Sequence, residues 1–389
     1  MRRYRDFARS EDAVQEALID AAEAWAVTGV PDQPLGWLIT VASRRYIDQV
    51  RSDVARERRE QAVLDATPRD ALVAAPADAD GPVDDSLELL FLCCHPALTA
   101  SAQLALTLRA VCGLSTAAIA SAFLVPSTTM GQRISRAKQR LADAGVTFEM
   151  PSGSAWDSRL SVVQHVVYLM FSEGYSASVG PDLQRPELTA QALQLTRRLH
   201  RLLPESTETA GLLALMLLTE SRRSARTGAG GALVPLDEQD RTRWDPNDIA
   251  EGTALITRAL GAGQIGPYQL QAAIAAVHAE APSVADTDWP QIAALYRLLE
   301  GLAPNPVVTL NRAVAVAMVE GPAAGLDLVR ELDGGVLHGT HRLLAVRAHL
   351  LALAGDHRAA ASGYHRAARL ATSVPEQRFL LRRAAECAG

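Results

Sequence analysis

A chain of 389 residues, 48% hydrophobic but only 5% aromatic, predicts two or three mainly helical domains, because alanine and leucine favour helices while strand formers are scarce. Its net charge of −6 argues against a protein that coats nucleic acid uniformly, but is compatible with a local basic face. The sequence has no apolar run near about 18 residues. It also has no secretory signal and no CxxC pair among its four cysteines, so a reduced cytoplasmic protein is expected.

Two helices are predicted in the first 61 residues. The first covers residues 10–27, where Ser10 is placed to cap it. Its apolar face consists of Ala13, Val14, Ala17, Leu18, Ala21 and Trp25. The stretch TGVPDQPLG interrupts the helical pattern, and a second helix begins near Pro34. The first half of this second helix is apolar on one face, whereas its far half is almost wholly charged and is expected to extend into solvent.

Two linkers divide the rest of the chain. Residues 62–83 sustain no period and are rich in alanine, proline and aspartate, which predicts a flexible linker. Helices resume in residues 84–145, and a shorter linker is expected at 146–154. From residue 155 to 389 the sequence again predicts helices, interrupted by the loop TGAGGALVPLDEQDRTRWDPND.

The stretch LSTAAIASAFLVPSTTMGQRISRAKQRL has the spacing of a helix-turn-helix. Ser115 is expected to cap the first helix, and Ser127 or Thr128 the second. The second helix turns Met130, Ile134, Ala137 and Leu141 toward the core. Its outer side is polar and basic, carrying Gln132, Arg133, Ser135, Arg136, Lys138 and Arg140. Such a helix suits the major groove of DNA, although an ordinary basic surface helix shows the same pattern.

The last hundred residues hold a repeat, in about residues 285–389. Gly321 and Gly355 lie 34 residues apart, and two such periods separate Tyr296 from Tyr364. The spacing of Gly355, Ala360, Tyr364 and Ala367 is typical of a tetratricopeptide helix pair. The helices from 155 to 280 do not keep this register and are interpreted as divergent repeats or as a separate bundle.

Candidate catalytic and metal-binding residues are few. Cys93, Cys94 and His95 lack the usual ligand spacing, so buried cysteines are expected there and no metal or other cofactor. The serines of FSEGYSAS have no G-x-S-x-G elbow and no identifiable base, which argues against a hydrolase. The sequence therefore favours a binding protein over an enzyme.

Taken together, the chain resembles an RNA polymerase sigma factor of the sigma-70 family, extracytoplasmic-function type. SEDAVQEAL resembles the sigma-2 helix that docks on polymerase, and PLGWLITVASRRYIDQVR is similar to the helix that reads and melts the −10 element. Residues 84–145 resemble the sigma-4 domain, with the helix-turn-helix as its −35 reader. The stretches VYLMFSEGYSAS and ALYRLLEGLAPNPVVTLNRAVAVAMVEGP resemble the tetratricopeptide-like C-terminal extension of one subgroup.

The resemblance implies an all-α fold with sigma-2 in residues 1–61, sigma-4 in 84–145 and a helical extension in 155–389. The implied partners are core RNA polymerase and promoter DNA. The residues implied to bind polymerase are Glu11, Asp12, Gln15 and Glu16. Those implied at the −10 element are Trp37, Arg44, Arg45, Asp48 and Arg51. Those implied at the −35 element are Ser127, Thr128, Gln132, Arg133, Ser135, Arg136, Lys138 and Arg140. The extension is expected to regulate activity through a peptide or protein ligand, or by contact with the sigma domains.

Two features depart from the family pattern. Only about ten residues precede EDAVQEA, where the family has a further helix. Either the start codon is placed too late, which we favour, or this sigma-2 domain is short and weakened. Arg44 stands where the family often has Asn, so the usual contact at that position is in doubt. Trp37 fits a core tryptophan at a helix start better than a base-stacking surface. The main alternative function is a helix-turn-helix regulator with a peptide-sensing extension, which predicts a symmetric dimer on palindromic sites, and a third is a scaffold whose basic helix is incidental.

Overall fold

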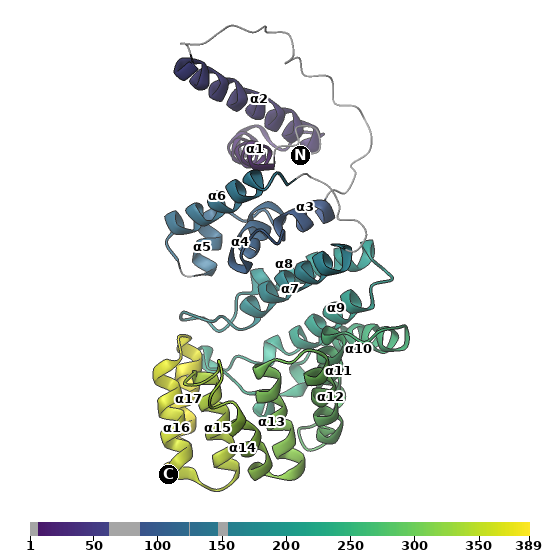
Figure 1. The fold of residues 1–389 in the computed structure, drawn as a ribbon, viewed down its shortest axis with the longest axis vertical. Helices are drawn as coiled ribbons and strands as arrows, with labels where there is room; N and C mark the ends of the chain where they lie inside the picture. Colours follow the sequence, from purple (N-terminus) through teal and green to yellow (C-terminus); the bar gives the residue numbers. More distant parts are fainter. Residues whose placement is uncertain (1–6, 62–85, 124, 147–154) are drawn as a thin grey trace. The chain divides into compact units, whose positions relative to one another are not determined.

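The computed structural model describes residues 7–61, 86–123, 125–146 and 155–389, and the long elements in these ranges are all α-helices (Figure 1). The all-α prediction is therefore confirmed. The chain divides into two compact units: the first holds the helices up to Val163, and the second holds residues from Gln164 to Gly389. No helix in the described ranges is both long and apolar enough to cross a membrane. The predicted linkers at 62–83 and 146–154 lie almost wholly outside the described residues.

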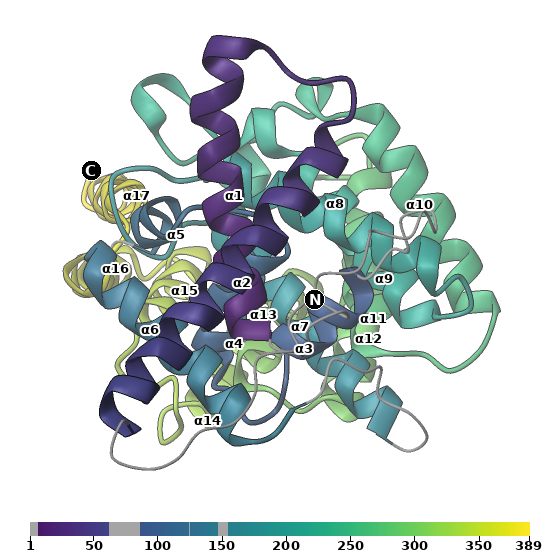
Figure 2. The ribbon, with the colours of Figure 1, turned by 90° about the horizontal axis from the view of Figure 1, so that it is seen from above.

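The first unit opens with a helical hairpin of α1 (Phe7–Thr28) and α2 (Pro34–Gln61), which Figure 2 shows from above. Alanines form the buried stripe of α1, at Ala13, Ala17 and Ala21. Val14 and Leu18, predicted on the same face, are instead 40% exposed. The prediction that Ser10 caps α1 is wrong, since the helix begins three residues earlier and Ser10 is buried within it.

The rest of the first unit is a small bundle of α3 (Ser86–Cys93), α4 (Ala100–Ala110), α5 (Thr116–Ala122) and α6 (Ser127–Asp143). Its core includes Phe91, Leu106, Ile119 and Met130, all fully buried. The four residues predicted on the inner face of α6 are all buried. The beginning of α7 (Ala155–Tyr175) completes this core, because Trp156 stacks 5.1 Å from Phe91.

The turn between α5 and α6 was predicted in part. Ser115 caps α5 as expected, accepting a hydrogen bond of 3.0 Å from the backbone N–H of Ala118. The prediction that Ser127 or Thr128 caps α6 is wrong. The N-cap is Pro126, with no side-chain hydrogen bond, because both hydroxyl residues already lie inside the helix.

The second unit is organised around α9 (Thr207–Glu220), which is buried along almost its whole length. It packs against α8 (Pro186–Leu202), α10 (Pro246–Gly261) and α11 (Pro267–Glu280). The approach to α11 is close: a Cβ added at Gly211 would lie 2.8 Å from the backbone nitrogen of Gln269. Because the two backbones come this close, position 211 requires a residue without a side chain, which accounts for a glycine inside the apolar α9.

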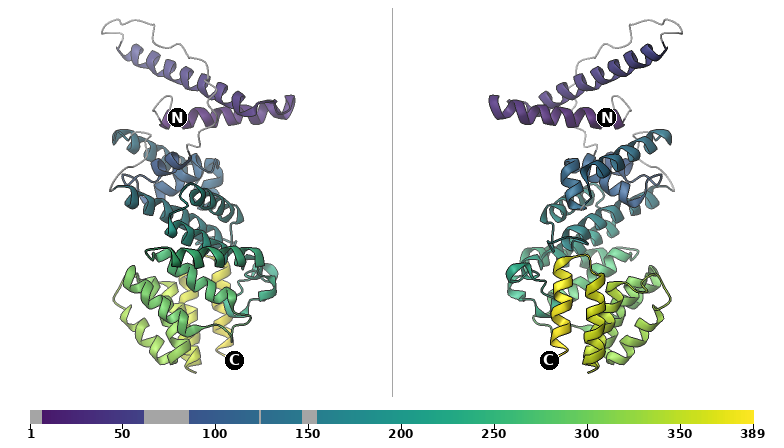
Figure 3. Two further views of the ribbon diagram at one scale, coloured as in Figure 1. Left: turned by 90° about the vertical axis from the view of Figure 1, so that its right-hand side faces the viewer. Right: turned by 90° about the vertical axis from the view of Figure 1, so that its left-hand side faces the viewer.

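Antiparallel helices follow, namely α12 (Trp289–Leu302), α13 (Pro306–Glu320), α14 (Pro322–Glu331), α15 (His341–Leu353), α16 (His357–Leu370) and α17 (Val374–Glu386). They lie side by side, coloured green to yellow in Figure 3. Gly321 and Gly355 occupy equivalent turns, α13 to α14 and α15 to α16, both with positive φ. Tyr364 is buried against Ala348 and Ala360. These hairpins have the register of the predicted repeat, and the tetratricopeptide assignment stays a prediction.

The second unit closes on itself. Its last helices meet the α7–α8 turn, where Gly180 forms a β-bridge with Ser373 and the Thr372 hydroxyl donates to the Ser178 carbonyl at 2.6 Å. The loop between α9 and α10, which contains short 3-10 turns, also reaches α17, since Arg382 pairs with Glu238 at 3.2 Å. A repeat array that contacts only its neighbours would leave these ends free.

Candidate functional site

The predicted polymerase-binding residues lie on the first turns of α1, but they are not equally available. Glu16 is exposed and Gln15 and Asp12 are half-buried, whereas Glu11 is buried. A carboxylate is buried at a large cost unless cations and hydrogen bonds surround it. The buried carboxylate of Glu11 therefore requires cations or hydrogen-bond donors close to it.

Glu11 lies between two cations from the helix-turn-helix bundle. Lys138 of α6 binds both Glu11 and Asp12 through its ammonium group. Arg109 of α4 lies with its Nε 3.3 Å from the other carboxylate oxygen of Glu11. Arg109 also donates to the Leu114 carbonyl at 3.2 Å, at the start of the turn that leads into α5. We call Glu11, Asp12, Arg109 and Lys138 the α1–α6 ion cluster.

The prediction that Lys138 lies on the outer side of α6 is wrong in this structure. Its side chain is only 10% exposed, because α1 covers that part of the helix. The other predicted −35 residues do face outward. Arg133 is half-buried, and the exposed ones are Ser127, Thr128, Gln132, Ser135, Arg136 and Arg140.

On α2 the predicted −10 residues likewise differ in whether they are exposed or bound to α1. Arg44 and Asp48 are exposed. Arg45 forms a double hydrogen bond with Asp20 of α1, at 2.8 and 3.0 Å, and this bond raises the pKa of the Arg45 guanidinium. The side chain of Arg51 lies outside the described residues.

Trp37 packs against Trp25 of α1, with ring centroids 5.5 Å apart and planes inclined by 59°. Trp37 is half-buried and is part of the α1–α2 contact, so it lies at the edge of that contact and not in a closed core.

The cysteine pair behaves as the sequence suggests. Cys93 and Cys94 are fully buried, and burial raises the pKa of Cys94 to about 12, so neither is a ready thiolate. His95 is engaged through Nδ1, which accepts from the Ala97 backbone. Within the described parts of the chain, no group of three or more His, Cys, Asp or Glu residues could hold a metal ion.

The FSEGYSAS motif forms the end of α7 and the start of the α7–α8 turn, and its contacts are structural. Glu173 accepts from the backbone N–H of Ser178 at 3.2 Å and lies 3.9 Å from Arg185. Arg226 stacks over the Tyr175 ring, 3.7 Å from its centroid. These contacts hold the α7–α8 turn in place and resemble no nucleophile–base pair.

Sequence comparison places these helices in known families. Sigma-70 region 2 matches residues 1–56, and Sigma-70, region 4 matches residues 88–141. The chain belongs to the sigma-70 family. As a sigma factor it acts in transcription initiation, binds core RNA polymerase and promoter DNA, and is not an enzyme. Region 2 thus comprises α1 and α2, and region 4 comprises α3 to α6.

The sigma factor also matches a family of unknown function (DUF6596) over residues 159–260, which spans most of α7 to α10. It is 44% identical over 383 residues to the uncharacterized protein R00370 of Rhizobium meliloti (strain 1021), covering 98% of this chain and 90% of that protein. No solved structure matches the chain.

Sequence reasoning missed Arg109. It lies in an apolar helix with no motif around it, and only its position beside Glu11 gives it a role. Two residues nearly a hundred positions apart, on different predicted domains, share no periodic signal that could have linked them.

Proposed function

We propose that this sigma factor is of the extracytoplasmic-function type, reading a −35 element with α6 and a −10 element with α2. The observation that carries the proposal is α6 itself: its apolar face is buried, and Gln132, Arg136 and Arg140 stand exposed on its other side. Only residues 57–87 separate the two sigma matches, which leaves no room for another sigma domain between them. That two-domain plan is the one expected of this type.

In this proposal the protein converts binding energy into DNA opening. Exposed cations such as Arg44 hold the backbone near the melted segment, and α6 positions the duplex upstream. A base leaves the stack at a cost of a few kcal/mol, which a pocket for the correct base returns. The loop between α1 and α2 is the segment expected to supply that pocket.

The α1–α6 ion cluster must open before its residues can contact polymerase or promoter DNA. Lys138 cannot hold a phosphate while it binds Glu11, and Glu11 cannot meet polymerase while it is buried. The same residues are therefore engaged with one another in the free chain. Loading onto polymerase then exchanges the pair between α1 and α6 for contacts with polymerase and promoter.

A footprint on promoter DNA tests the assignment. With core polymerase, the protein should protect two unlike elements and open the DNA at the downstream one. A helix-turn-helix regulator would instead protect a palindrome without polymerase. Protection of a palindrome by the protein alone would replace the proposal with that alternative.

The second unit is proposed to regulate the sigma domains, by contact with them or through a ligand, and its helix pairs are proposed to be tetratricopeptide-like. A chain ending at Val163 tests the first point, because that boundary keeps Trp156 and Arg159, which support Phe91. Promoter-dependent transcription by this shortened chain should differ from that by the full chain, either in amount or in its response to a ligand of the second unit. A chain ending at 154 is the matched control, expected to lose stability in region 4 as well. Unchanged transcription by the chain ending at Val163 would exclude a regulatory role.

A further inference from the structure

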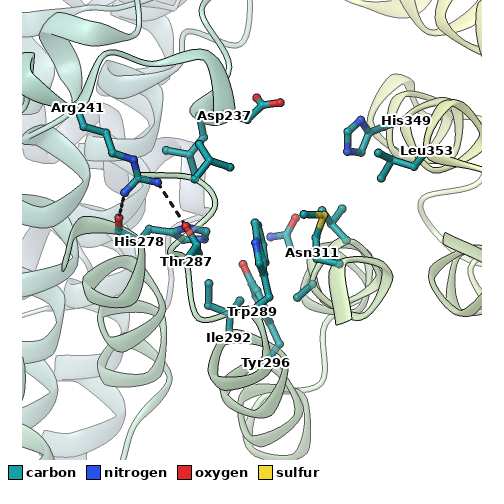
Figure 4. Close-up of a pocket in the computed structure, with 15 residues that line it drawn as sticks. Asp237, Arg241, His278, Thr287, Trp289, Ile292, Tyr296, Asn311, His349 and Leu353 are labelled. Carbon is teal, nitrogen blue, oxygen red and sulfur yellow. Dashed lines mark hydrogen bonds between the residues drawn. The ribbon is translucent and has the colours of Figure 1, made fainter. Parts of the chain in front are cut away.

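A pocket of about 440 Å³ lies within the second unit (Figure 4). It is formed by α11, α12, α13 and α15 on one side and by the loop Arg223–Trp244 on the other. Most of its wall is apolar, with Trp289, Met318 and Leu353 as large members. Cavities of roughly 300–1,000 Å³ with apolar walls and a few polar groups are typical small-molecule sites.

The loop limits what can enter. At one end Arg241 donates from Nη1 to the carbonyls of His278 and Ala281, at 2.6 and 2.5 Å, which ties the loop to the end of α11. At the other end Glu238 pairs with Arg382 of α17. Leu236 and Asp237, directly before Glu238, line the pocket together with residues of α13 and α15. The loop thus covers one side of the pocket, while Met318 and Leu353 at its rim stay 43% and 47% exposed, which leaves room for a compact molecule to enter.

Arg241 brings a positive charge to the wall, and its guanidinium also lies 4.7 Å from the centroid of the Trp244 ring. In the described part of the chain no carboxylate lies within ion-pair distance of its guanidinium, and its buried Nε has no hydrogen-bond partner. Burial lowers the pKa of Arg241, the nearby Arg222 lowers it further, and Asp286 acts in the opposite direction. A part-buried cation that has no ion-pair partner is costly to hold, and a bound anion would offset part of that cost.

The other polar groups of the pocket are mostly neutral. Burial lowers the pKa of His278 to about 4 and also lowers the pKa of His349, so both imidazoles are uncharged near neutral pH. Asn311 presents an exposed amide between them (Figure 4). Asp237 is the one carboxylate among the described lining residues, and it is exposed to solvent rather than paired with Arg241.

We propose that this pocket binds a small organic anion with a ring-sized apolar body. The body packs against Trp289, Met318 and Leu353, and the anionic group meets Arg241. The proposal does not depend on how the sigma domains act.

Two dyes test it on the full chain. 8-Anilino-1-naphthalenesulfonate is an aromatic anion whose fluorescence rises in apolar sites, and N-phenyl-1-naphthylamine has the same rings without the sulfonate. The anion should bind the folded protein saturably at one site, about tenfold more tightly than the neutral dye. Arg241→Gln should remove most of this preference.

A matched pair of variants locates the site. Met318 lines the pocket and is 43% exposed, and its neighbour Val319 is 44% exposed but does not line it. Met318→Trp should weaken binding of the anion about tenfold by filling the space, whereas Val319→Trp should leave it unchanged.

Three results would overturn the proposal: no saturable binding of the anion, equal binding of the neutral dye, or equal effects of the two tryptophan variants. If Arg241→Gln fails to fold, because it also holds the end of α11, the dye comparison and the tryptophan pair still decide the matter. None of these measurements uses polymerase or DNA, so failure here leaves the sigma assignment untouched.

Discussion

At the scale of single residues, two glutamates of α1, Glu11 and Glu16, differ strongly in how far their side chains are exposed. Glu11 is 2% exposed and lies between Arg109 and Lys138, whereas Glu16 on the same helix is 53% exposed and 3.9 Å from Arg45. Glu11→Ala leaves two cations without their buried partner and should lower the free energy of unfolding by about 3 kcal/mol in urea titrations. Glu16→Ala should change it by less than about 0.5 kcal/mol. Equal effects would mean that the ion cluster contributes little in solution.

Gly211 offers a second residue-scale test. A methyl group there would meet the Gln269 backbone at 2.8 and 2.9 Å, and a backbone in a packed helix cannot move away. Gly211→Ala should therefore destabilise the protein by about 1–3 kcal/mol, seen as a lower melting temperature. Gly261→Ala, on α10 with nothing within 4 Å, should be neutral or slightly stabilising. A neutral Gly211→Ala would contradict the close packing of α9 on α11.

At the scale of elements, α6 was predicted well on its inner face and less well on its outer one. Helical periodicity fixes that Met130, Ile134 and Leu141 point inward, because a regular spacing of apolar residues marks a buried face. It cannot tell which part of the opposite face another helix covers. Lys138 therefore looked like its exposed neighbours until α1 was seen to cover it.

The exposed cations of α6 make a prediction about salt. Arg136→Ala should weaken binding of the polymerase complex to duplex DNA and reduce the slope of log affinity against log salt by about one, since one phosphate contact is lost. Gln139→Ala is the matched control, because Gln139 is exposed on the same helix but hydrogen-bonds Asp143. An unchanged slope in the Arg136 variant would show that this face does not contact the backbone.

At the scale of the whole molecule, the sequence predicted helices throughout, the sigma domains and the period of the last hairpins. These features have local signals: apolar spacing, glycine at turns and recognisable stretches of residues. It did not predict that the second unit closes on itself, since that closure depends on contacts such as Thr372 with Ser178, which are 194 residues apart. The pocket depends on the same kind of long-range contact, so the sequence did not predict it either.

As a sigma factor, this protein should load onto core RNA polymerase. The most direct measurement is gel filtration of the full chain with bacterial core RNA polymerase. A second sigma factor of that polymerase serves as a positive control. We predict that the protein co-elutes with the polymerase in a one-to-one complex. Elution of the protein apart from a polymerase that binds the control would show that this chain does not act as a sigma factor.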